Sequence, residues 1–319
     1  MEDKMVNKFP SWSLATLWAK FGILFILILM VILMGVLSEN FLSQYNLLNV
    51  LRQVSLVAIL GVGMTFVILS AEIDLSVGSI VGLTSCATAG AMVAGYGIFL
   101  SILWGVLLGI GIGIVNGIVH TYGRIPSFIV TLGMTTIARG AVLVYTQAYP
   151  ITGLPDSFAF IGKGYIGSIP TQVIIMAIIF IIAGIVLRYT MFGRNVYAIG
   201  GNSEAARLSG INVKVNKVII FGIMGLTAGI AGVILASRLF SGQPSSGVGM
   251  ELDAIAATII GGTSFSGGKG SVFGTLAGAL IMGVLNNGLN LLGVSTYWQM
   301  IAMGSIIVLA VWIDRLKEK

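Results

Sequence analysis

The chain has 319 residues, of which 57% are hydrophobic and only 9% are charged, and its mean hydropathy is +1.03. A soluble domain carries about 25% charged residues, so this composition excludes an ordinary soluble protein and predicts an integral membrane protein. The single cysteine, Cys86, excludes an intrachain disulfide, and the single histidine, His120, excludes a multi-histidine metal site. We expect Cys86 to pack among small residues and His120 to be satisfied at the end of a helix.

Ten apolar segments indicate membrane-spanning helices, each of which needs about 20 mostly apolar residues. Lysines precede the first segment and no cleavage site follows it, which favours an uncleaved span over a signal peptide. The eighth segment is short, and only a polar break separates the second from the third. The sequence therefore predicts one all-α transmembrane domain, residues 1–319, with about ten spans and some interrupted helices. The segments are 21–37, 47–70, 76–95, 98–119, 126–147, 169–188, 217–237, 251–266, 271–292 and 297–313.

The basic residues are distributed unequally between the two sides of the membrane. If the N-terminus is cytoplasmic, an even number of spans returns the C-terminus to the cytoplasm. Of the seventeen basic residues, all but Arg52, Arg139, Lys163 and Arg238 then lie on the cytoplasmic side, as the positive-inside rule requires. The same asymmetry accounts for the net charge of +6 without a nucleic-acid partner. The predicted cytoplasmic segments include 1–20, the loop 189–216 and the tail 314–319.

The stretch GGTSFSGGKGS, Gly261–Ser271, has the composition of a phosphate-binding loop. A P-loop requires G-x-x-x-x-G-K-[ST], so that a lysine and then a hydroxyl follow the second glycine. Here the lysine follows Gly268, but Thr263 stands where the first glycine is needed and Gly270 stands where the hydroxyl is needed. Apolar sequence flanks the stretch on both sides. We therefore expect a tight turn or helix break at the membrane face, around Gly267 and Gly268, and no nucleotide site.

Charged residues interrupt or enter the apolar segments at three places, where burial is costly without a partner. Glu72 and Asp74 lie in AEIDLSVGS, a second helix break, and Glu251 and Asp253 open the eighth segment. Arg139 lies near the middle of the fifth segment. We expect Arg139 to pair with one of these acids, and the residues leave a structural ion pair and a transport role equally open.

Glycines recur every four residues at Gly105, Gly109, Gly113 and Gly117. This small-xxx-small spacing places them in one stripe along a helix, where another backbone can approach closely. The pattern predicts helix packing, and it has no feature of a nucleotide-binding fingerprint.

The loop 189–216 is too polar to span the membrane. Within it, NSEAARLSG (202–210) favours a short helix that Asn202 or Ser203 can cap and Gly210 can end. Such a helix on the cytoplasmic face suits docking of a soluble partner, but a simple connector is equally compatible with these residues.

Neutral amides gather late in the chain, at Asn286, Asn287, Asn290 and Gln299. Amides donate and accept hydrogen bonds, which suits the path of a neutral hydroxylated solute. The alternative is hydrogen bonding between helices. No set of residues for hydrolysis or redox chemistry can be assembled around one histidine, so we do not expect an enzyme.

Four stretches resemble the ribose-type sugar permeases, which are the membrane subunits of bacterial ABC importers. They are GMTFVILSAEIDLSVGSIVGL (63–83), FGRNVYAIGGNSEAARLSGINV (192–213), residues 251–295 and YWQMI (297–301). The resemblance implies a type II-like permease architecture and a homodimer in the bacterial inner membrane. It also implies an extracytoplasmic sugar-binding protein and a cytoplasmic ATPase that carries ATP and magnesium, so that this chain holds no cofactor.

The resemblance further implies that the segment within 189–216 is the coupling helix that docks into the ATPase. We expect the two alanines to permit close approach and the charged pair to meet charges at the rim of the partner's groove. The implied coupling residues are Gly201, Asn202, Ser203, Glu204, Ala205, Ala206, Arg207, Leu208 and Gly210.

The resemblance makes ribose the first expectation for the solute. Permeases for xylose, allose, galactose, inositol or a signalling sugar share these motifs. The competing class is an ion-coupled secondary transporter of a small polar solute, which Arg139 and the acids near the breaks keep open.

Overall fold

The computed structural model describes residues 14–317, with the side chains of residues 22–309 and 311–312. The predicted cytoplasmic ends, 1–20 and 314–319, therefore lie largely outside the described residues. Within the described part the fold is all-α apart from one two-stranded ribbon, as the sequence predicts. The helices are α1 Leu14–Leu37, α2 Gln44–Leu69, α3 Val77–Val93, α4 Ile98–Gly123, α5 Ser127–Thr146, η1 Asp156–Phe158, α6 Ala159–Lys163, α7 Thr171–Tyr189, α8 Met191–Gly201, α9 Ser203–Leu208, α10 Val213–Leu239, α11 Met250–Ile260, α12 Val272–Leu291 and α13 Thr296–Lys317, and the strands are β1 Tyr165–Ile166 and β2 Ile169–Pro170.

Each of the ten predicted spans contains a helix, but the helices differ in length. Within the described residues six are long and apolar enough to cross a membrane, namely α2, α4, α5, α7, α10 and α12. Helix α3 is a shorter apolar helix, and so are the parts of α1 and α13 whose side chains are described, Gly22–Leu37 and Thr296–Leu309. Helix α11 has 11 residues, which at a rise of about 1.5 Å per residue reach about half of a 30 Å hydrocarbon core. Helix α11 therefore does not cross the membrane by itself.

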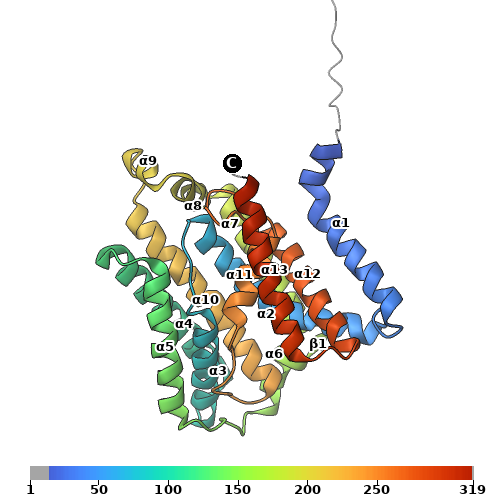
Figure 1. The fold of residues 1–319 in the computed structure, drawn as a ribbon. Helices are drawn as coiled ribbons and strands as arrows, with labels where there is room; N and C mark the ends of the chain where they lie inside the picture. Colours follow the sequence, from blue (N-terminus) through green and yellow to red (C-terminus); the bar gives the residue numbers. More distant parts are fainter. Residues whose placement is uncertain (1–13, 318–319) are drawn as a thin grey trace, which may run out of the picture.

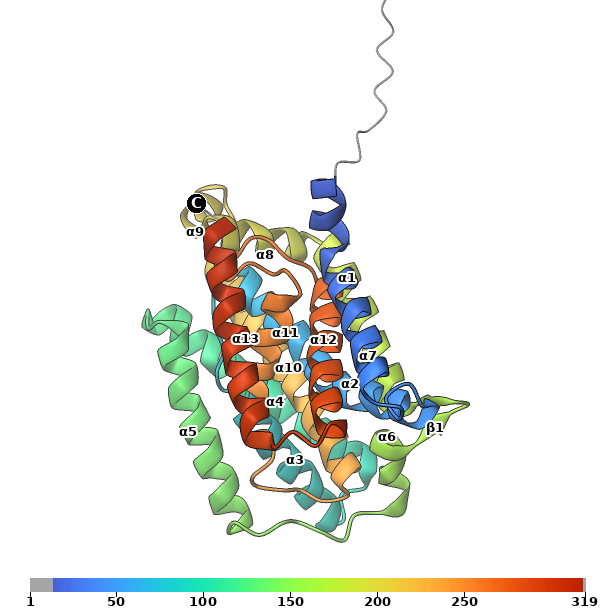
Figure 2. The same ribbon diagram turned by 45° about the vertical axis from the view of Figure 1, so that its right-hand side comes forward.

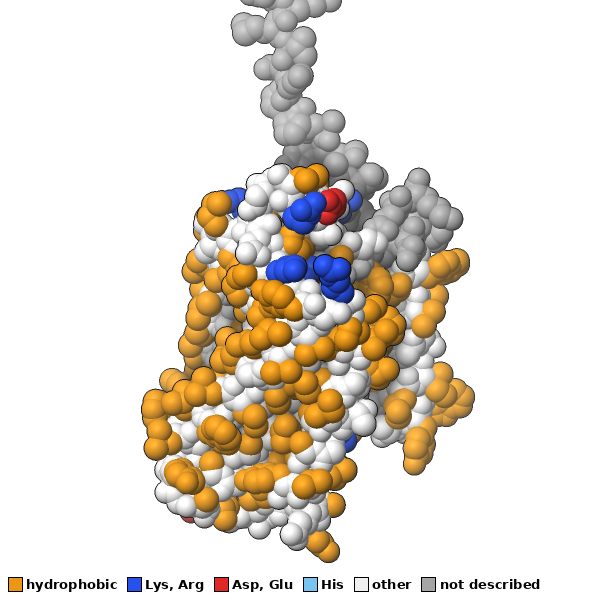
Figure 3. Space-filling model, turned by 90° about the vertical axis from the view of Figure 1, so that its left-hand side faces the viewer, with side chains coloured by type: hydrophobic (Ala, Val, Ile, Leu, Met, Phe, Trp, Pro, Cys, Tyr) orange, Lys and Arg blue, Asp and Glu red, His pale blue; other side chains and the backbone are white. Residues whose placement is uncertain are grey.

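Helices α2 and α10 form the centre of the bundle. Their apolar windows are 78% and 61% buried, against 22% for those of α4 and α5. The peripheral helices expose apolar side chains, and Figure 3 shows one face of the molecule covered by them. This is the inverse of a soluble protein's surface and fits a chain whose solvent is lipid.

The start of α1, the helix α9 and the end of α13 lie at the same end of the bundle (Figures 1 and 2). This arrangement agrees with an even number of crossings. We refer to this end as the α9 end and to the other as the far end.

Glycines set the distance between α4 and α10. A Cβ atom on Gly109 would lie 2.5 Å from the carbonyl oxygen of Gly225, and one on Gly113 would collide with the carbonyl oxygen of Phe221. All four glycines of the predicted stripe are buried. The packing prediction for the stripe is therefore confirmed: Gly109, Gly113 and Gly117 face α10, and Gly105 faces α3.

Two non-helical links run through the interior of the bundle. Residues 70–76 leave the end of α2 near the α9 end and run back toward α3, and residues 240–249 connect α10 to the short α11 (Figure 1). The starts of α3 and α11 meet where Gly78 and Gly247 leave no room for a side chain between them. Exposed peptide groups are tolerated at membrane depth only where protein or water satisfies them. The side chains that form hydrogen bonds with these two links are therefore the first candidates for functional residues.

The glycine seam gives a direct test of this packing. We expect Gly109→Ala to lower the free energy of unfolding by about 1–3 kcal/mol, because overpacking a close contact forces the two helices apart. The matched control is Gly111→Ala on the same helix, since a Cβ atom there meets no atom within 4 Å. Thermal unfolding in detergent measures both, and equal midpoints for the two variants would contradict the seam.

Candidate coupling site and solute path

Helix α9 is a capped helix at the surface of the α9 end. The Asn202 side chain accepts hydrogen bonds from the backbone N–H of Glu204 at 3.1 Å and of Ala205 at 2.9 Å. The chain leaves the helix through Gly210, whose φ of +87° is the left-handed conformation that glycine adopts without strain. The short helix expected from NSEAARLSG is confirmed, with Asn202 rather than Ser203 as its cap.

The faces of α9 differ from the sequence expectation. Ala206 is only 5% exposed, so it packs against this chain and cannot be the surface that meets a partner. Glu204 and Arg207 form an ion pair with each other at 2.6 Å. Ala205 and Leu208 are exposed, Leu208 at 74%. The short helix buries Ala206 against its own protein, and Ala205 and Leu208 belong to the side that stays accessible.

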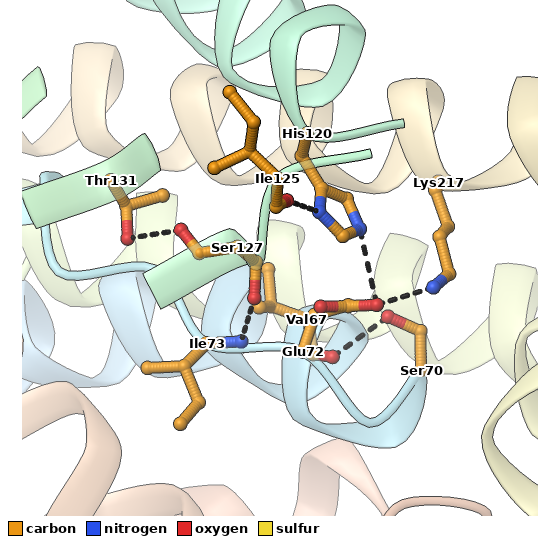
Figure 4. Close-up of polar contacts among 9 residues, drawn as sticks. All are labelled: Val67, Ser70, Glu72, Ile73, His120, Ile125, Ser127, Thr131 and Lys217. Atoms are coloured by element: carbon orange, nitrogen blue, oxygen red, sulfur yellow. Dashed lines mark hydrogen bonds and ion pairs between the residues drawn. The ribbon is translucent and has the colours of Figure 1, made fainter. Parts of the chain in front are cut away.

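The carboxylate of Glu72 joins three elements behind α9 (Figure 4). Lys217, near the start of α10, donates to Glu72, and the Nε2 atom of His120 on α4 lies 3.2 Å from the same carboxylate. The Nδ1 atom of His120 donates to the carbonyl oxygen of Ile125 at 2.7 Å. Both ring nitrogens of His120 thus have a polar partner. His120 is satisfied at the end of a helix, as expected.

The surroundings of Glu72 keep it charged. Burial of the carboxyl group would by itself raise its pKa, but the hydrogen bond from His120 and the charge of Lys217 lower the pKa to about 2 from the ordinary value of 4.5. A depressed pKa contributes stability that is present above the unfolded value and is lost as the pH falls toward 2. Glu72 is therefore ionised at any pH at which transport is measured.

The link 70–76 is held by side chains from α4 and α5. The Ile73 N–H donates to the Ser127 hydroxyl at 3.2 Å. Asp74 is fully buried and accepts from the Ser76 N–H at 2.8 Å and the Ser76 hydroxyl at 2.6 Å. Asn116 in turn donates to the Ser76 hydroxyl at 2.9 Å. Side chains thus supply hydrogen bonds where the helix is broken.

Arg139 holds the second link, and the expected ion pair is wrong. Its guanidinium donates to the backbone carbonyls of Pro244 at 2.7 Å and Ser246 at 2.9 Å. No carboxylate lies within 4 Å of Arg139 among the described residues. Carbonyls left free by a broken helix are strong acceptors, so a cation replaces the missing backbone donors. This contact gives Arg139 a structural role in positioning the start of α11.

The glycine-rich stretch is the turn between α11 and α12. Gly262, Gly267 and Gly268 have positive φ angles, and the Gly268 N–H donates to the carbonyl oxygen of Leu69 at 2.9 Å. The turn and the end of α2 both pack closely against Gly200 of α8. A Cβ atom on Gly200 would collide with the carbonyl oxygen of Leu69 and with the backbone nitrogen of Gly268. The turn expected from the sequence is confirmed, and it packs between the end of α2 and α8.

Three of the four predicted amides form hydrogen bonds with amide side chains of other helices. Asn287 exchanges two hydrogen bonds with Asn46 of α2, at 2.8 and 2.9 Å, and both residues are buried. Gln299 of α13 donates to the Asn290 side chain at 2.8 Å. The alternative of hydrogen bonding between helices thus describes these contacts, while a place on the solute path remains a prediction.

A polar cavity of about 410 Å³ opens beside these amides at the far end. Asn287 and Asn290 line it, but half-buried Asn286 does not. The sequence analysis did not identify the residues of α2 that line this cavity. They are Asn46, Asn49 and Gln53, whose spacing of i, i+3 and i+7 puts three amides on one face of the helix. Among the residues whose side chains the structure describes, none with a charge lines the cavity. Its walls are Asn40, Ser43, Tyr45, Asn46, Asn49, Gln53, Asn287, Asn290 and Leu291.

Comparison with known proteins identifies the class. Residues 46–311 match the family described as branched-chain amino acid transport system / permease component, and the chain belongs to this family. It is thus a component of a transport system and not an enzyme.

Curated relatives narrow the class further. The chain is similar to the ribose import permease proteins of Bacillus subtilis (48% identical, covering 92% of this chain and 91% of the relative) and Escherichia coli K12 (47%, 92% of each). It is also similar to the D-allose transport system permease protein of Escherichia coli K12 (43%, 97% of this chain and 95% of the relative). No solved structure matches.

Thiol labelling tests the geometry of the cavity. In a background with Cys86→Ala, whose thiol is buried, we expect Asn49→Cys and Asn290→Cys to react with a water-soluble reagent. Asn287→Cys should react at least about tenfold more slowly, since its site is only 4% exposed and thiolate access sets the rate. Equal rates at all three positions would show that the cavity is not formed as described.

Proposed function

We propose that the chain is the membrane-spanning permease of an ATP-driven bacterial importer of ribose. The observation that supports a sugar as the solute is the far-end cavity. Amide and hydroxyl groups line it, and none of its described lining residues is charged. A neutral sugar needs only such donors and acceptors, whereas an amino acid carries two charges that would require charged partners. The cavity thus favours the sugar of the named relatives over the amino acids of the family description.

The candidate sugars can be ranked by how similar the chain is to the permeases named for each of them. The named ribose permeases are 47–48% identical to the chain, the D-allose permease is 43% identical, and the xylose permeases are 38–39% identical. We therefore place ribose first. Its path begins at the far-end cavity, with Asn290, Asn49 and Gln53 as the groups that meet the solute.

The partners follow from the class of importer. A sugar-binding protein delivers ribose at the far end, and an ATP-binding subunit carrying ATP and magnesium docks at the α9 end, so that this chain needs no cofactor. The chain works as a pair with a second copy of itself in the bacterial inner membrane, with both termini cytoplasmic. Exposed Ala205 and Leu208 of α9 form the contact with the ATP-binding subunit.

The structure offers a route from α9 to the interrupted helices. Helix α9 leads directly into α10, where Lys217 is paired with Glu72 of the link before α3. A displacement of α9 therefore pulls on the link through a charged contact. Ion-coupled transport is the weaker proposal, because Glu72 and Arg139, two of the charged residues that suggested it, are already engaged with protein groups.

Uptake into proteoliposomes tests the proposal. The permease is reconstituted with its ATP-binding subunit and binding protein and offered radiolabelled ribose, allose, xylose and leucine. We expect ribose to be accumulated only with ATP. Accumulation of leucine in preference to ribose would contradict the solute, and uptake driven by an ion gradient without ATP would contradict the importer.

The exposed face of α9 supplies a mutational test of coupling. We expect Ala205→Trp to abolish ATP-driven ribose uptake, because added bulk in a close contact costs about 1–3 kcal/mol or more, while the variant still inserts. Ala206→Trp is not a clean test, since its site is buried within this chain. Ala94→Trp, exposed at the end of α3, is the control and should transport normally. Normal transport by Ala205→Trp would reduce α9 to a connector.

Removal of the Glu72 charge tests the route through the link. Glu72→Gln keeps the shape of the side chain but leaves Lys217 without its anion. We expect basal ATP hydrolysis to persist while its stimulation by the loaded binding protein and ribose uptake fall at least about tenfold, the effect of a 1.4 kcal/mol loss in coupling. Glu39→Gln, an exposed change outside the link, is the control. Full stimulation in Glu72→Gln would rule out this route.

A further inference from the structure

A second cavity, of about 420 Å³, lies beside α9 at the α9 end of the bundle. The end of α4, the start of α5, helix α9 and the start of α10 form its walls. Four cations line it, namely Arg124, Arg207, Lys214 and Lys217, against the single carboxylate of Glu204. The solute path and the proposed contact face of α9 do not include this cavity.

Two of its cations have no anion of their own. Arg207 is paired with Glu204 and Lys217 with Glu72. Among the described residues, no carboxylate lies within 4 Å of Arg124 or Lys214. The Lys214 ammonium lies 5.2 Å from the centre of the Tyr122 ring, an arrangement that orients the cation without neutralising it. The cavity therefore carries uncompensated positive charge.

The cavity adjoins the apolar outer surface of the bundle. Tyr122 and Ile125 near the end of α4, Phe128 of α5 and Ile219 of α10 are exposed beside it. Figure 3 shows basic side chains gathered where the apolar face ends, toward the end at which Figure 1 places α9. In a bilayer this is the level of the lipid head groups, so a ligand can meet the cations while its hydrocarbon part remains in the membrane.

We propose that this cavity binds the phosphate of an anionic membrane phospholipid, whose acyl chains lie along the exposed apolar side chains of α4 and α10. Basic pockets between transmembrane helices at the membrane surface bind such head groups. Arg124 and Lys214 supply the free charges, and the head group bridges α4 to α10 directly beside α9. The inference requires only that the chain lies in a bilayer, and it is independent of the transported solute.

Lipid retention tests the site. The full-length protein is purified in mild detergent with mixed phosphatidylglycerol and phosphatidylcholine, and bound lipid is quantified by mass spectrometry. Each cation near a membrane surface contributes about a fivefold preference for anionic lipid, so the double variant Arg124→Gln/Lys214→Gln should bind phosphatidylglycerol about 30-fold more weakly. The charge-preserving variant Arg124→Lys/Lys214→Arg should retain it, which separates loss of charge from loss of fold.

A matched control removes the same charge elsewhere at the α9 end. Arg188→Gln/Arg194→Gln alters α7 and α8, neither residue lines the cavity, and Arg188 also lies over a ring, that of Tyr189, at 5.5 Å. This control should retain the wild-type amount of phosphatidylglycerol. Equal retention by the cavity variant and the control would overturn the proposal.

Two further arms address other occupants. Millimolar inorganic phosphate should not displace bound phosphatidylglycerol, because it lacks the acyl chains. Complete displacement by inorganic phosphate would assign the cavity to a soluble anion. Likewise, complete displacement when the ATP-binding subunit is added would assign it to a protein contact, and either result would contradict a lipid site.

Discussion

The ionised carboxylate of Glu72 is the contact on which the rest of the structure depends. It lies between a lysine from α10 and a histidine from α4, in a link where the peptide chain leaves helical geometry. Removing the lysine would leave a buried carboxylate without its counter-ion, which costs far more than a surface ion pair contributes. The contacts of Lys217 and His120 with Glu72 therefore stabilise the non-helical link inside the bundle.

Helix α2 connects the two ends of the molecule. At the far end its amides form one wall of the cavity that we assign to the sugar, and at the α9 end the carbonyl oxygen of Leu69 accepts from the glycine-rich turn. Its window is also the most buried of the six long spans. A densely packed interior transmits strain, so α2 is a second route, beside Glu72, for the coupling that we propose.

The sequence predicts those features that depend on local spacing. Apolar length locates the helices, the four-residue glycine repeat predicts the α4–α10 seam, and Asn202 followed by alanines predicts a capped helix. The missing glycine at Thr263 favours a turn over a nucleotide loop, and the structure has a turn there. Each of these rests on residues within about one to three helical turns of each other.

Features that depend on tertiary contacts could not be predicted. Lys217 lies 145 residues from Glu72 along the chain, and no local pattern links them. The partners of Arg139 are backbone carbonyls, which every residue carries. Which face of α9 is buried is fixed by the bundle beneath it, so Ala206 was assigned to the wrong surface. The α2 amides were missed because their helix is otherwise strongly apolar.

Hydrogen exchange of the link 70–76 tests the central claim most directly, because its amides are the groups held by the contacts around Glu72. The permease is compared alone and with its ATP-binding subunit and a non-hydrolysable ATP analogue, and peptides covering α9 and the link are followed by mass spectrometry. The account predicts that binding at α9 changes exchange in the link, and that Glu72→Gln abolishes this change while protection of α9 persists. Protection of α9 with no change in the wild-type link would contradict it.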